Sequence, residues 1–224
     1  MIVLCPSRNR PGNALRAMES ARDTASDPGS FRYVVLVDHD DPTLPEYEAL
    51  GLDVMPVAPG GYVSALNQAS RALMDQADII GAYQDDLLFR TQGWDDRVRE
   101  TLATPGIAYG DDLLQGEHHP TAIFMSTAII EALGWLALPT IWHQWADDVW
   151  KALGQAAGCL RYMPDVTIEH IHPANGKAAM DPGYERVFGD NYGAEHRATS
   201  DYYAYHGWLE DRMDIDVAKV RAVL

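Results

Sequence analysis

Neighbouring aspartates are the residues of this sequence most suited to chemistry, and they stand at 40–41, 85–86, 95–96, 111–112 and 147–148. Asp85 and Asp86 lie between two apolar runs, residues 79–83 and 87–89, which the fold must bury. Two adjacent carboxylates in such a place repel each other and are costly to bury without a cation. Carboxylate oxygens suit Mg²⁺ and Mn²⁺, ions that can also bridge a diphosphate. From these residues alone, a metal site and an ordinary polar turn are equal alternatives.

Two histidines, His170 and His172, end a strand-like run, and in a strand they lie on the same face. They are therefore candidates for metal ligands. The pattern by itself favours a simpler interpretation, a pair of surface or hydrogen-bonded histidines. A second pair, His118 and His119, has no partner at a fixed spacing.

A third candidate is the pair Asp147 and Asp148, which stands between Trp145 and Trp150. One interpretation is structural, because acidic residues are favoured in the first turn of a helix and the tryptophans would then be core residues. The other is chemical, with a carboxylate beside aromatic faces acting as a general base toward a hydroxyl group. The residues themselves leave both interpretations open.

Alternating strand-like and helix-like segments position these residues and predict an α/β unit with a largely parallel sheet. Strands are expected at residues 1–5, 31–37, 52–57, 79–83, 106–110 and 166–171, and helices at 13–23, 62–75, 147–157 and from Ser200 onward. Ligands of such sheets bind beyond the carboxyl ends of the strands. Asp38, Asp85 and Asp111 each stand at a strand end, which predicts an acidic site there. Asp95 begins a helix and is assigned no chemistry.

Composition excludes several other classes of protein. The chain has 224 residues, 47% of them hydrophobic and 22% charged, as in globular proteins with a sizeable core. No stretch approaches the roughly 20 apolar residues of a membrane span, and residues 1–5 are too short for a signal peptide, so we expect a cytoplasmic protein. A net charge of −16 disfavours broad binding to nucleic acid. Cys5 and Cys159 are expected to be core thiols.

A series of short motifs follows the expected strands. They are Pro-Ser-Arg-Asn-Arg-Pro at 6–11, Val-Asp at 37–38, Gly-Gly at 60–61 followed by Asn67, Gln-Asp-Asp at 84–86, Gly-Trp-Asp at 93–95, Asp-Asp-Val at 147–149, and Pro-Asp at 164–165 followed by His170. Their order resembles the GT-A fold of nucleotide-sugar glycosyltransferases, nearest to the large inverting family-two group. The resemblance covers residues 1–173.

The resemblance implies an α/β architecture, the Rossmann-like three-layer GT-A fold with a mixed, mostly parallel central sheet and a C-terminal helical appendage. Residues 1–173 would form the nucleotide-sugar-binding and catalytic domain. Residues 174–224 would form a helical extension packed on it.

The resemblance also implies a donor site. The segment 6–11 and Asp38 would contact the base and ribose of the donor, and Asp85 would contact its ribose or its sugar. Arg8 or Arg10 would offset charge on the departing nucleoside diphosphate. The implied donor-binding residues are Pro6, Ser7, Arg8, Arg10, Asp38, Asp40, Asn67 and Asp85. His39 stands where a second acid often follows, so the base contact is open between Asp38 and Asp40.

A metal and a base are implied in the same way. Asp86, in the place of the last acid of the family's Asp-X-Asp motif, would bind Mn²⁺ or Mg²⁺. His170 matches a histidine that completes the metal shell in some members, and His172 is the alternative. Asp148 matches the second acid of the family's Glu-Asp motif, the base that deprotonates the acceptor, which implies inversion. Gln84 departs from the motif, where many members have Asp.

The implied activity is metal-dependent transfer of a hexosyl or pentosyl group from a nucleoside-diphosphate sugar, with a UDP-sugar favoured, to an acceptor hydroxyl. The acceptor is open among a glycan, a small molecule, a protein and a modified DNA base. One rival is a nucleotidyltransferase of related fold, although residues 6–12 lack the glycine-rich run usual in that group. The other rival is a nucleotide- or sugar-binding protein with a degenerate site.

Overall fold

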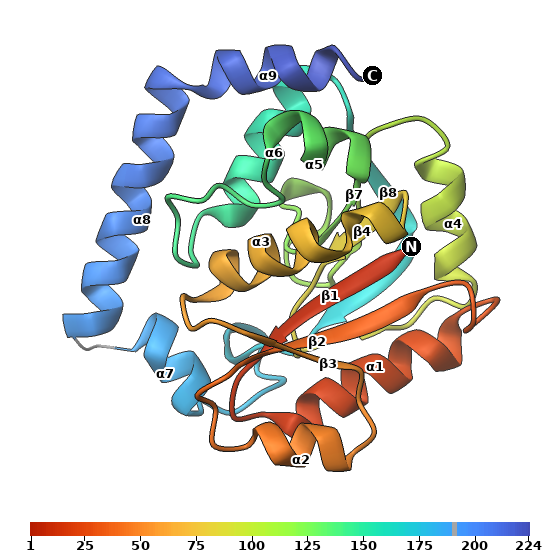
Figure 1. Ribbon diagram of the computed structural model, residues 1–224, viewed down its shortest axis with the longest axis vertical. Helices are drawn as coiled ribbons and strands as arrows, with labels where there is room; N and C mark the ends of the chain where they lie inside the picture. The colour runs from red at the N-terminus through yellow and green to blue at the C-terminus, as the bar shows by residue number, and fades with distance from the viewer. Residues whose placement is uncertain (190–191) are drawn as a thin grey trace.

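The computed structural model describes residues 1–189 and 192–224, and an eight-stranded mixed sheet runs through the molecule (Figure 1). Its strands are β1 (Ile2–Ser7), β2 (Arg32–Asp38), β3 (Val54–Val57), β4 (Ile79–Ala82), β5 (Leu87–Phe89), β6 (Ile107–Asp111), β7 (Ile123–Ser126) and β8 (Leu160–His170). They are ordered β3-β2-β1-β4-β7-β6-β8-β5. β5 and β7 run antiparallel to their neighbours, and the other described strands share one direction. The mixed, mostly parallel sheet expected from the sequence is confirmed.

Helices cover both faces of this sheet and give the fold three layers. They are α1 (Pro11–Thr24), α2 (Leu44–Ala49), α3 (Tyr62–Leu73), α4 (Trp94–Thr101), α5 (Thr127–Leu133), α6 (Ala146–Ala157), α7 (Pro182–Phe188), α8 (Tyr192–Asp211) and α9 (Met213–Arg221). No helix in the described part of the chain has the length and apolar composition that crossing a membrane requires.

Strand side chains alternate between two apolar clusters because successive residues of a strand point to opposite faces. In β2, Val34 and Leu36 pack in the cluster that includes α3, α5 and α6, whereas Val35 packs in the cluster that includes α1 and α4. Cys5 and Cys159 are buried in different clusters, so both are core thiols. β1 and β2, with six and seven residues, are therefore buried along almost their whole length between two helical layers.

One strand is longer than the sequence predicted. We expected a strand only at 166–171, because Pro164 and Asp165 are typical of a loop, but β8 extends from Leu160 to His170. A bulge explains the difference: the pairing with β6 jumps from Gly110–Met163 to Asp111–Thr167. A β-bulge takes up extra residues without ending the strand. Gly110 permits it, since a Cβ there would lie 2.4 Å from the carbonyl oxygen of Val166.

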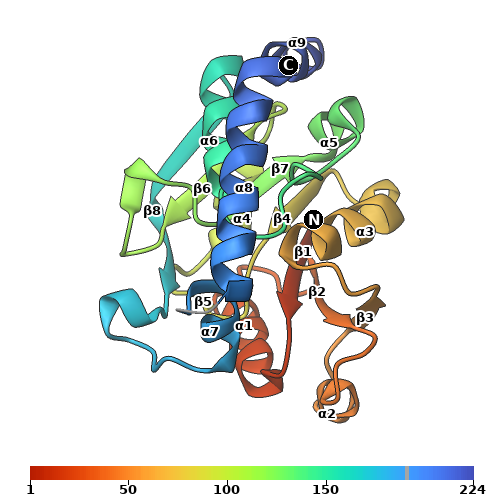
Figure 2. The same cartoon turned by 90° about the vertical axis from the view of Figure 1, so that its left-hand side faces the viewer.

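The C-terminal helices pack against the same core. α8 runs along one side of the molecule and α9 crosses its end, next to α5 and α6 (Figures 1 and 2). Trp208, Val217 and Val220 are buried in the cluster shared with α3, α5 and α6. The expected start of the helical tail at Ser200 is wrong, because α8 begins at Tyr192. Residues 193–199 lack an apolar stripe that would have indicated the earlier start.

Asp95 serves the fold. It is fully buried at the start of α4, and its carboxylate accepts hydrogen bonds from Ser26 N at 2.7 Å, Asp27 N at 3.2 Å and Ser30 Oγ at 3.1 Å. These three residues belong to the loop between α1 and β2. Asp95 therefore joins α4 to that loop.

Asp95→Ala is expected to lower the free energy of unfolding by about 3 kcal/mol, because three donors of the loop between α1 and β2 lose a charged acceptor worth roughly 1.5–3 kcal/mol per bond, non-additively. Urea titration measures this loss. Asp96→Ala is the matched control, since its side chain is exposed on the same helix turn, and we expect a change within about 0.5 kcal/mol. Equal stability of the two variants would contradict the role of Asp95.

Candidate active site

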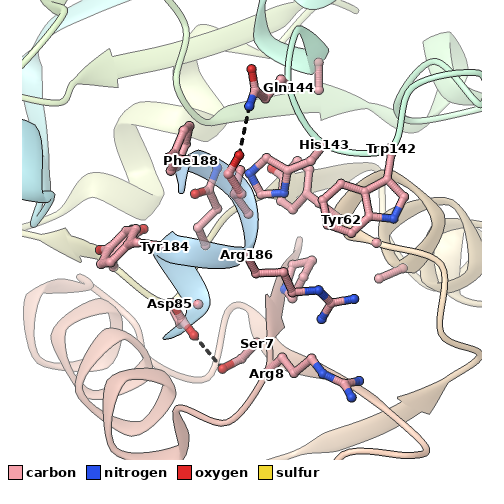
Figure 3. A pocket seen from close by; sticks show the side chains of 18 of the residues that line it. Ser7, Arg8, Tyr62, Asp85, Trp142, His143, Gln144, Tyr184, Arg186 and Phe188 are labelled. Carbon is pink, nitrogen blue, oxygen red and sulfur yellow. Dashed lines mark hydrogen bonds between the residues drawn. The ribbon is translucent and has the colours of Figure 1, made fainter. Parts of the chain in front are cut away.

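A cavity of about 650 Å³ opens where β1, β2 and β4 end (Figure 3). Its walls come from the loop after β1, the start of α3, residues 142–148, the end of β8, and α7. The sequence-predicted residues that line it are Pro6, Ser7, Arg8, Arg10, Asp38, Asp85, Asp86, Asp148, His170 and His172. Because parallel strands bring their carboxyl ends to one edge, residues far apart in the chain meet here.

Asp85 is bound to protein groups on both of its oxygens. Ser7 Oγ donates to Oδ2 at 2.6 Å, and Arg10 Nη1 lies 3.2 Å from Oδ1. Tyr47 OH lies 2.8 Å from the same Ser7 hydroxyl. Burial, followed by the charge of Asp86, raises the pKa of Asp85 to about 6. The Asp85 carboxylate is thus a fixed part of the cavity wall.

Arg8 connects the ends of β1 and β2. Its Nη1 donates to Asp38 Oδ2 and to Asp40 Oδ1, both at 2.6 Å. The hydrogen bond from Arg8 lowers the pKa of Asp40. Asp38 lines the cavity, whereas the Asp40 side chain is 51% exposed and lies outside the cavity lining. The structure therefore places Asp38, rather than Asp40, in the cavity wall.

Asp86 and His170 form the part of the cavity that suits a metal ion. Asp86 is 3% exposed, and its Oδ2 accepts a hydrogen bond from Tyr184 OH at 2.8 Å. Among the described residues, neither Asp86 Oδ1 nor either ring nitrogen of His170 has a hydrogen-bond partner. His170 Nε2 lies 3.5 Å from Asp86 Oδ2. Buried polar atoms without partners are rare, and a divalent cation satisfies both a carboxylate oxygen and an imidazole nitrogen.

His172 lies beside this pair. The ring centroids of His170 and His172 are 4.9 Å apart, and His172 Nδ1 accepts a hydrogen bond from Ala174 N at 3.1 Å. That bond leaves Nε2 as the ring nitrogen that remains for a ligand. The residues present thus fit a metal ion on Asp86 and His170, with His172 within reach of the same region.

A second group of possible ligands lies elsewhere in the cavity. Atoms of His119, Asp147 and Asp148 lie within 4.8 Å of one another, and His119 Nε2 is 2.7 Å from Asp147 Oδ2. The hydrogen bond with Asp147 raises the pKa of His119, so the imidazolium form is favoured. The sequence did not indicate this pair, because no fixed spacing relates a loop histidine to a helix start in another part of the chain.

Asp148 is chemically distinct from its neighbour. Asp148 forms no ion pair with a described residue, whereas Asp147 Oδ2 lies 2.7 Å from His119 Nε2. Burial, followed by the charge of Asp147, raises the pKa of Asp148. A half-buried carboxylate with a raised pKa, facing a cavity, has the properties of a general base.

Arg186 lines the cavity and was missed by the sequence analysis. Figure 3 shows its side chain extending from α7 on the same side of the cavity as Arg8. Its guanidinium lies 5.4 Å from the ring centre of Trp142 and forms no ion pair with a described residue. Burial, followed by the charge of Arg8, lowers the pKa of Arg186. A guanidinium group that lines a cavity without an ion-pair partner favours an anion such as a phosphate.

α7 is held over the cavity by Arg10. Arg10 Nη2 donates to Asp181 Oδ1 at 2.5 Å, and the Arg10 guanidinium lies 4.1 Å from the ring centre of Tyr184. Asp181 also caps α7, since its carboxylate accepts hydrogen bonds from Gly183 N and Tyr184 N. The loop after β1 and the C-terminal segment therefore form one side of the cavity together.

Asn67 lies elsewhere, although we expected it among the donor-binding residues. It is buried in α3, outside the cavity lining. Its Nδ2 donates to Ala137 O at 2.7 Å, and its Oδ1 accepts from Leu136 N at 2.9 Å and from Ala137 N at 3.1 Å. The amide is thus fully used in fastening residues 136–137 to α3, and we leave Asn67 out of the donor site.

Mn²⁺ titration will distinguish the two groups of possible ligands. We expect Asp86→Asn to weaken Mn²⁺ binding at least tenfold, because it removes the carboxylate that carries the unpartnered oxygen. Asp147→Asn is the matched variant in the second group and should change the affinity less than twofold, because a hydrogen bond from His119 already occupies one oxygen of that carboxylate. The reverse order, read by calorimetry or by electron paramagnetic resonance, would assign the ion to the His119 group.

Comparison with known proteins identifies the fold. Neither a protein-family model nor a curated protein sequence matches this chain. Among solved structures, the mannosyltransferase PcManGT from Pyrobaculum calidifontis, in complex with GDP-Man and Mn²⁺, is 14% identical with a TM-score of 0.61, covering 99% of this chain and 73% of that one. A second match is the glucosyl-3-phosphoglycerate synthase of Mycobacterium tuberculosis in complex with Mn²⁺, UDP-glucose and phosphoglyceric acid. It is 15% identical with a TM-score of 0.56, and the match covers 92% of this chain and 79% of that one.

Residues 1–349 of TarS from S. aureus, in complex with UDP, match with a TM-score of 0.56 at 11% identity, covering 95% of this chain and 73% of that one. These structures share the three-layer arrangement around a mixed sheet with the present chain. The protein has the GT-A fold of nucleotide-sugar glycosyltransferases.

Proposed function

We propose that this protein is a metal-dependent glycosyltransferase that moves a sugar from a nucleoside-diphosphate sugar to an acceptor hydroxyl with inversion. One observation carries the proposal: a single cavity holds both an unpartnered buried carboxylate oxygen on Asp86 and an unpaired carboxylate with a raised pKa on Asp148. The first suits the leaving nucleotide and the second suits the attacking hydroxyl. The GT-A fold of the chain is consistent with both roles.

The donor nucleotide lies along the ends of β1 and β2 in this proposal. Asp38 accepts hydrogen bonds from the base or the ribose, and Ser7 and Asp85 form the wall beneath. Arg8 and Arg186 face the diphosphate, whose negative charge offsets the burial and the repulsion by Arg8 that together lower the pKa of Arg186. UDP remains the favoured nucleotide.

Asp86 and His170 hold the divalent ion, Mn²⁺ or Mg²⁺, with His172 as the further ligand. When bound, such an ion supplies positive charge that stabilises the departing diphosphate. Tyr184 keeps Asp86 oriented, because its hydroxyl donates to Oδ2 and leaves Oδ1 free. The chain's own cations, Arg8 and Arg186, add to this stabilisation.

Asp148 acts as the general base. It accepts the proton of the acceptor hydroxyl while that oxygen attacks the anomeric carbon on the face opposite the leaving group. His119 keeps Asp147 in an ion pair, so the two adjacent carboxylates do not compete for the same proton. Trp145 lies in the cavity wall beside this base and offers an aromatic surface to the acceptor.

Calorimetric titration of UDP and GDP, each with and without Mn²⁺, tests the donor site. We expect Mn²⁺-dependent binding of one nucleotide, weakened at least tenfold in Asp86→Ala and unchanged in Asp96→Ala, which lies on the exposed face of α4. A protein that binds neither nucleotide under any metal is not a glycosyltransferase of this kind. Binding of a nucleotide without release of sugar from any of its sugar donors would instead favour a binding protein.

The pH dependence of sugar release tests the base. Because the pKa of Asp148 is raised, the rate should be lost as pH falls through a value above the ordinary range of aspartate, near 4. Asp147→Asn removes a negative neighbour and should move this acidic limb to lower pH. His119→Asn removes a positive neighbour and should move it to higher pH. Asp148→Asn should lower the rate at least 100-fold at pH values above the acidic limb, with nucleotide binding retained.

Shifts of the same sign in Asp147→Asn and His119→Asn would contradict the assignment, since the two neighbours act on Asp148 with opposite charge. If Asp148→Asn lost nucleotide binding and sugar release to the same degree, Asp148 would not be the base.

A further inference from the structure

A buried carboxylate in the C-terminal helix α8 is bound to the segment that precedes the proposed base. Asp201 is 1% exposed and accepts hydrogen bonds from three consecutive backbone N–H groups. Trp142 N donates to Oδ1 at 2.7 Å, and His143 N and Gln144 N donate to Oδ2, each at 2.9 Å. Asp201 forms no ion pair with a described residue, so these amides are what stabilise its buried charge.

The segment 142–145 leads directly into α6, whose first turn carries Asp148. Trp145 ends the segment with a φ of 71°, a left-handed conformation that a bulky residue adopts only when its surroundings impose it. The chain therefore turns sharply at Trp145 before the helix begins. The direction of that turn decides where the Asp148 carboxylate points.

Other contacts of the segment come from the cavity walls (Figure 3). Gln144 Nε2 donates to Val187 O at 3.2 Å, which joins the segment to α7. Val63 N donates to Trp142 O at 3.3 Å, and the Trp142 ring fills the space above Gly61, where a Cβ would lie 2.4 Å from Nε1. Asp201 accepts three hydrogen bonds from the segment. Hydrogen bonds to a charged acceptor such as a carboxylate are stronger than those to a neutral one.

We propose that Asp201 is a positioning residue for the general base: from the C-terminal helix it fixes residues 142–144, and so sets the turn at Trp145 and the place of Asp148 in the cavity. This inference rests on the proposed function. It gives α8 a part in the reaction beyond packing, because a helix from the C-terminal segment then controls the geometry of proton removal.

Asp201→Asn tests the proposal. The amide keeps one carbonyl acceptor but loses the charge and the second oxygen, so the amides of 142–144 should exchange hydrogen for deuterium faster. We expect kcat for sugar release to fall by about tenfold to a hundredfold, because small misplacement of a catalytic group has effects of this size. The nucleotide Kd and the donor KM should change less than twofold, since Asp201 lies outside the cavity lining. Asp201→Glu, which restores the charge, should recover part of kcat.

Asp216→Asn is the matched control. Asp216 is also buried in the C-terminal helices, at 2% exposure, but it bonds Trp208 Nε1 at 3.0 Å and Lys219 Nζ at 2.8 Å, away from the cavity. Asp216→Asn should lower the free energy of unfolding and leave kcat of the folded protein unchanged. Loss of kcat in both variants to the same degree would reduce Asp201 to a structural role.

If the wild type is active, an unchanged kcat in Asp201→Asn would overturn the positioning role alone, whether or not the amides of residues 142–144 exchange faster. A wild type that binds no nucleotide overturns the proposed function itself, and the two failures are therefore distinguishable. Unchanged exchange at 142–144 in Asp201→Asn overturns the inference whatever the activity.

Discussion

Two neighbouring carboxylates, Asp85 and Asp86, are buried side by side at the end of β4, and the surrounding structure compensates their charge. Ser7 and Arg10 donate to Asp85 from β1 and the loop after it. Asp86 receives one hydroxyl, from Tyr184, and keeps a free oxygen beside His170. Burial makes each of these partners necessary, because an uncompensated carboxylate in the interior is far more costly than one in water.

The two carboxylates differ in how many of their oxygens the protein binds, and this difference gives them separate roles. Both oxygens of Asp85 accept hydrogen bonds from protein groups, so Asp85 forms part of the cavity wall. Asp86 is only partly satisfied, since its Oδ1 has no hydrogen-bond partner among the described residues, and for this reason we propose it as a ligand of the divalent ion. A similar division holds for Asp147 and Asp148, because His119 pairs with the first and the second, which forms no ion pair with a described residue, is the base that we propose.

The C-terminal segment contributes contacts to the surroundings of both aspartate pairs. Asp181 and Tyr184 bind Arg10 and Asp86, while Asp201 binds the segment before α6. The carboxyl edge of a parallel sheet is open on one side, so a cavity there needs a wall from outside the sheet. Here that wall is α7, and α8 holds the adjoining segment in place.

The sequence by itself indicated the alternation of strands and helices and the edge at which the acids gather, because apolar runs and strand-end aspartates are local properties. It did not determine the bulge at Pro164, which depends on Gly110 of a neighbouring strand, or the use of Asn67 to hold residues 136–137. Only the tertiary structure decided that His119 pairs with Asp147, that Arg186 lines the cavity and that Asp201 accepts hydrogen bonds from residues 142–144. Their partners lie far away along the chain, and only packing of α7 and α8 against the sheet edge brings them within hydrogen-bonding distance.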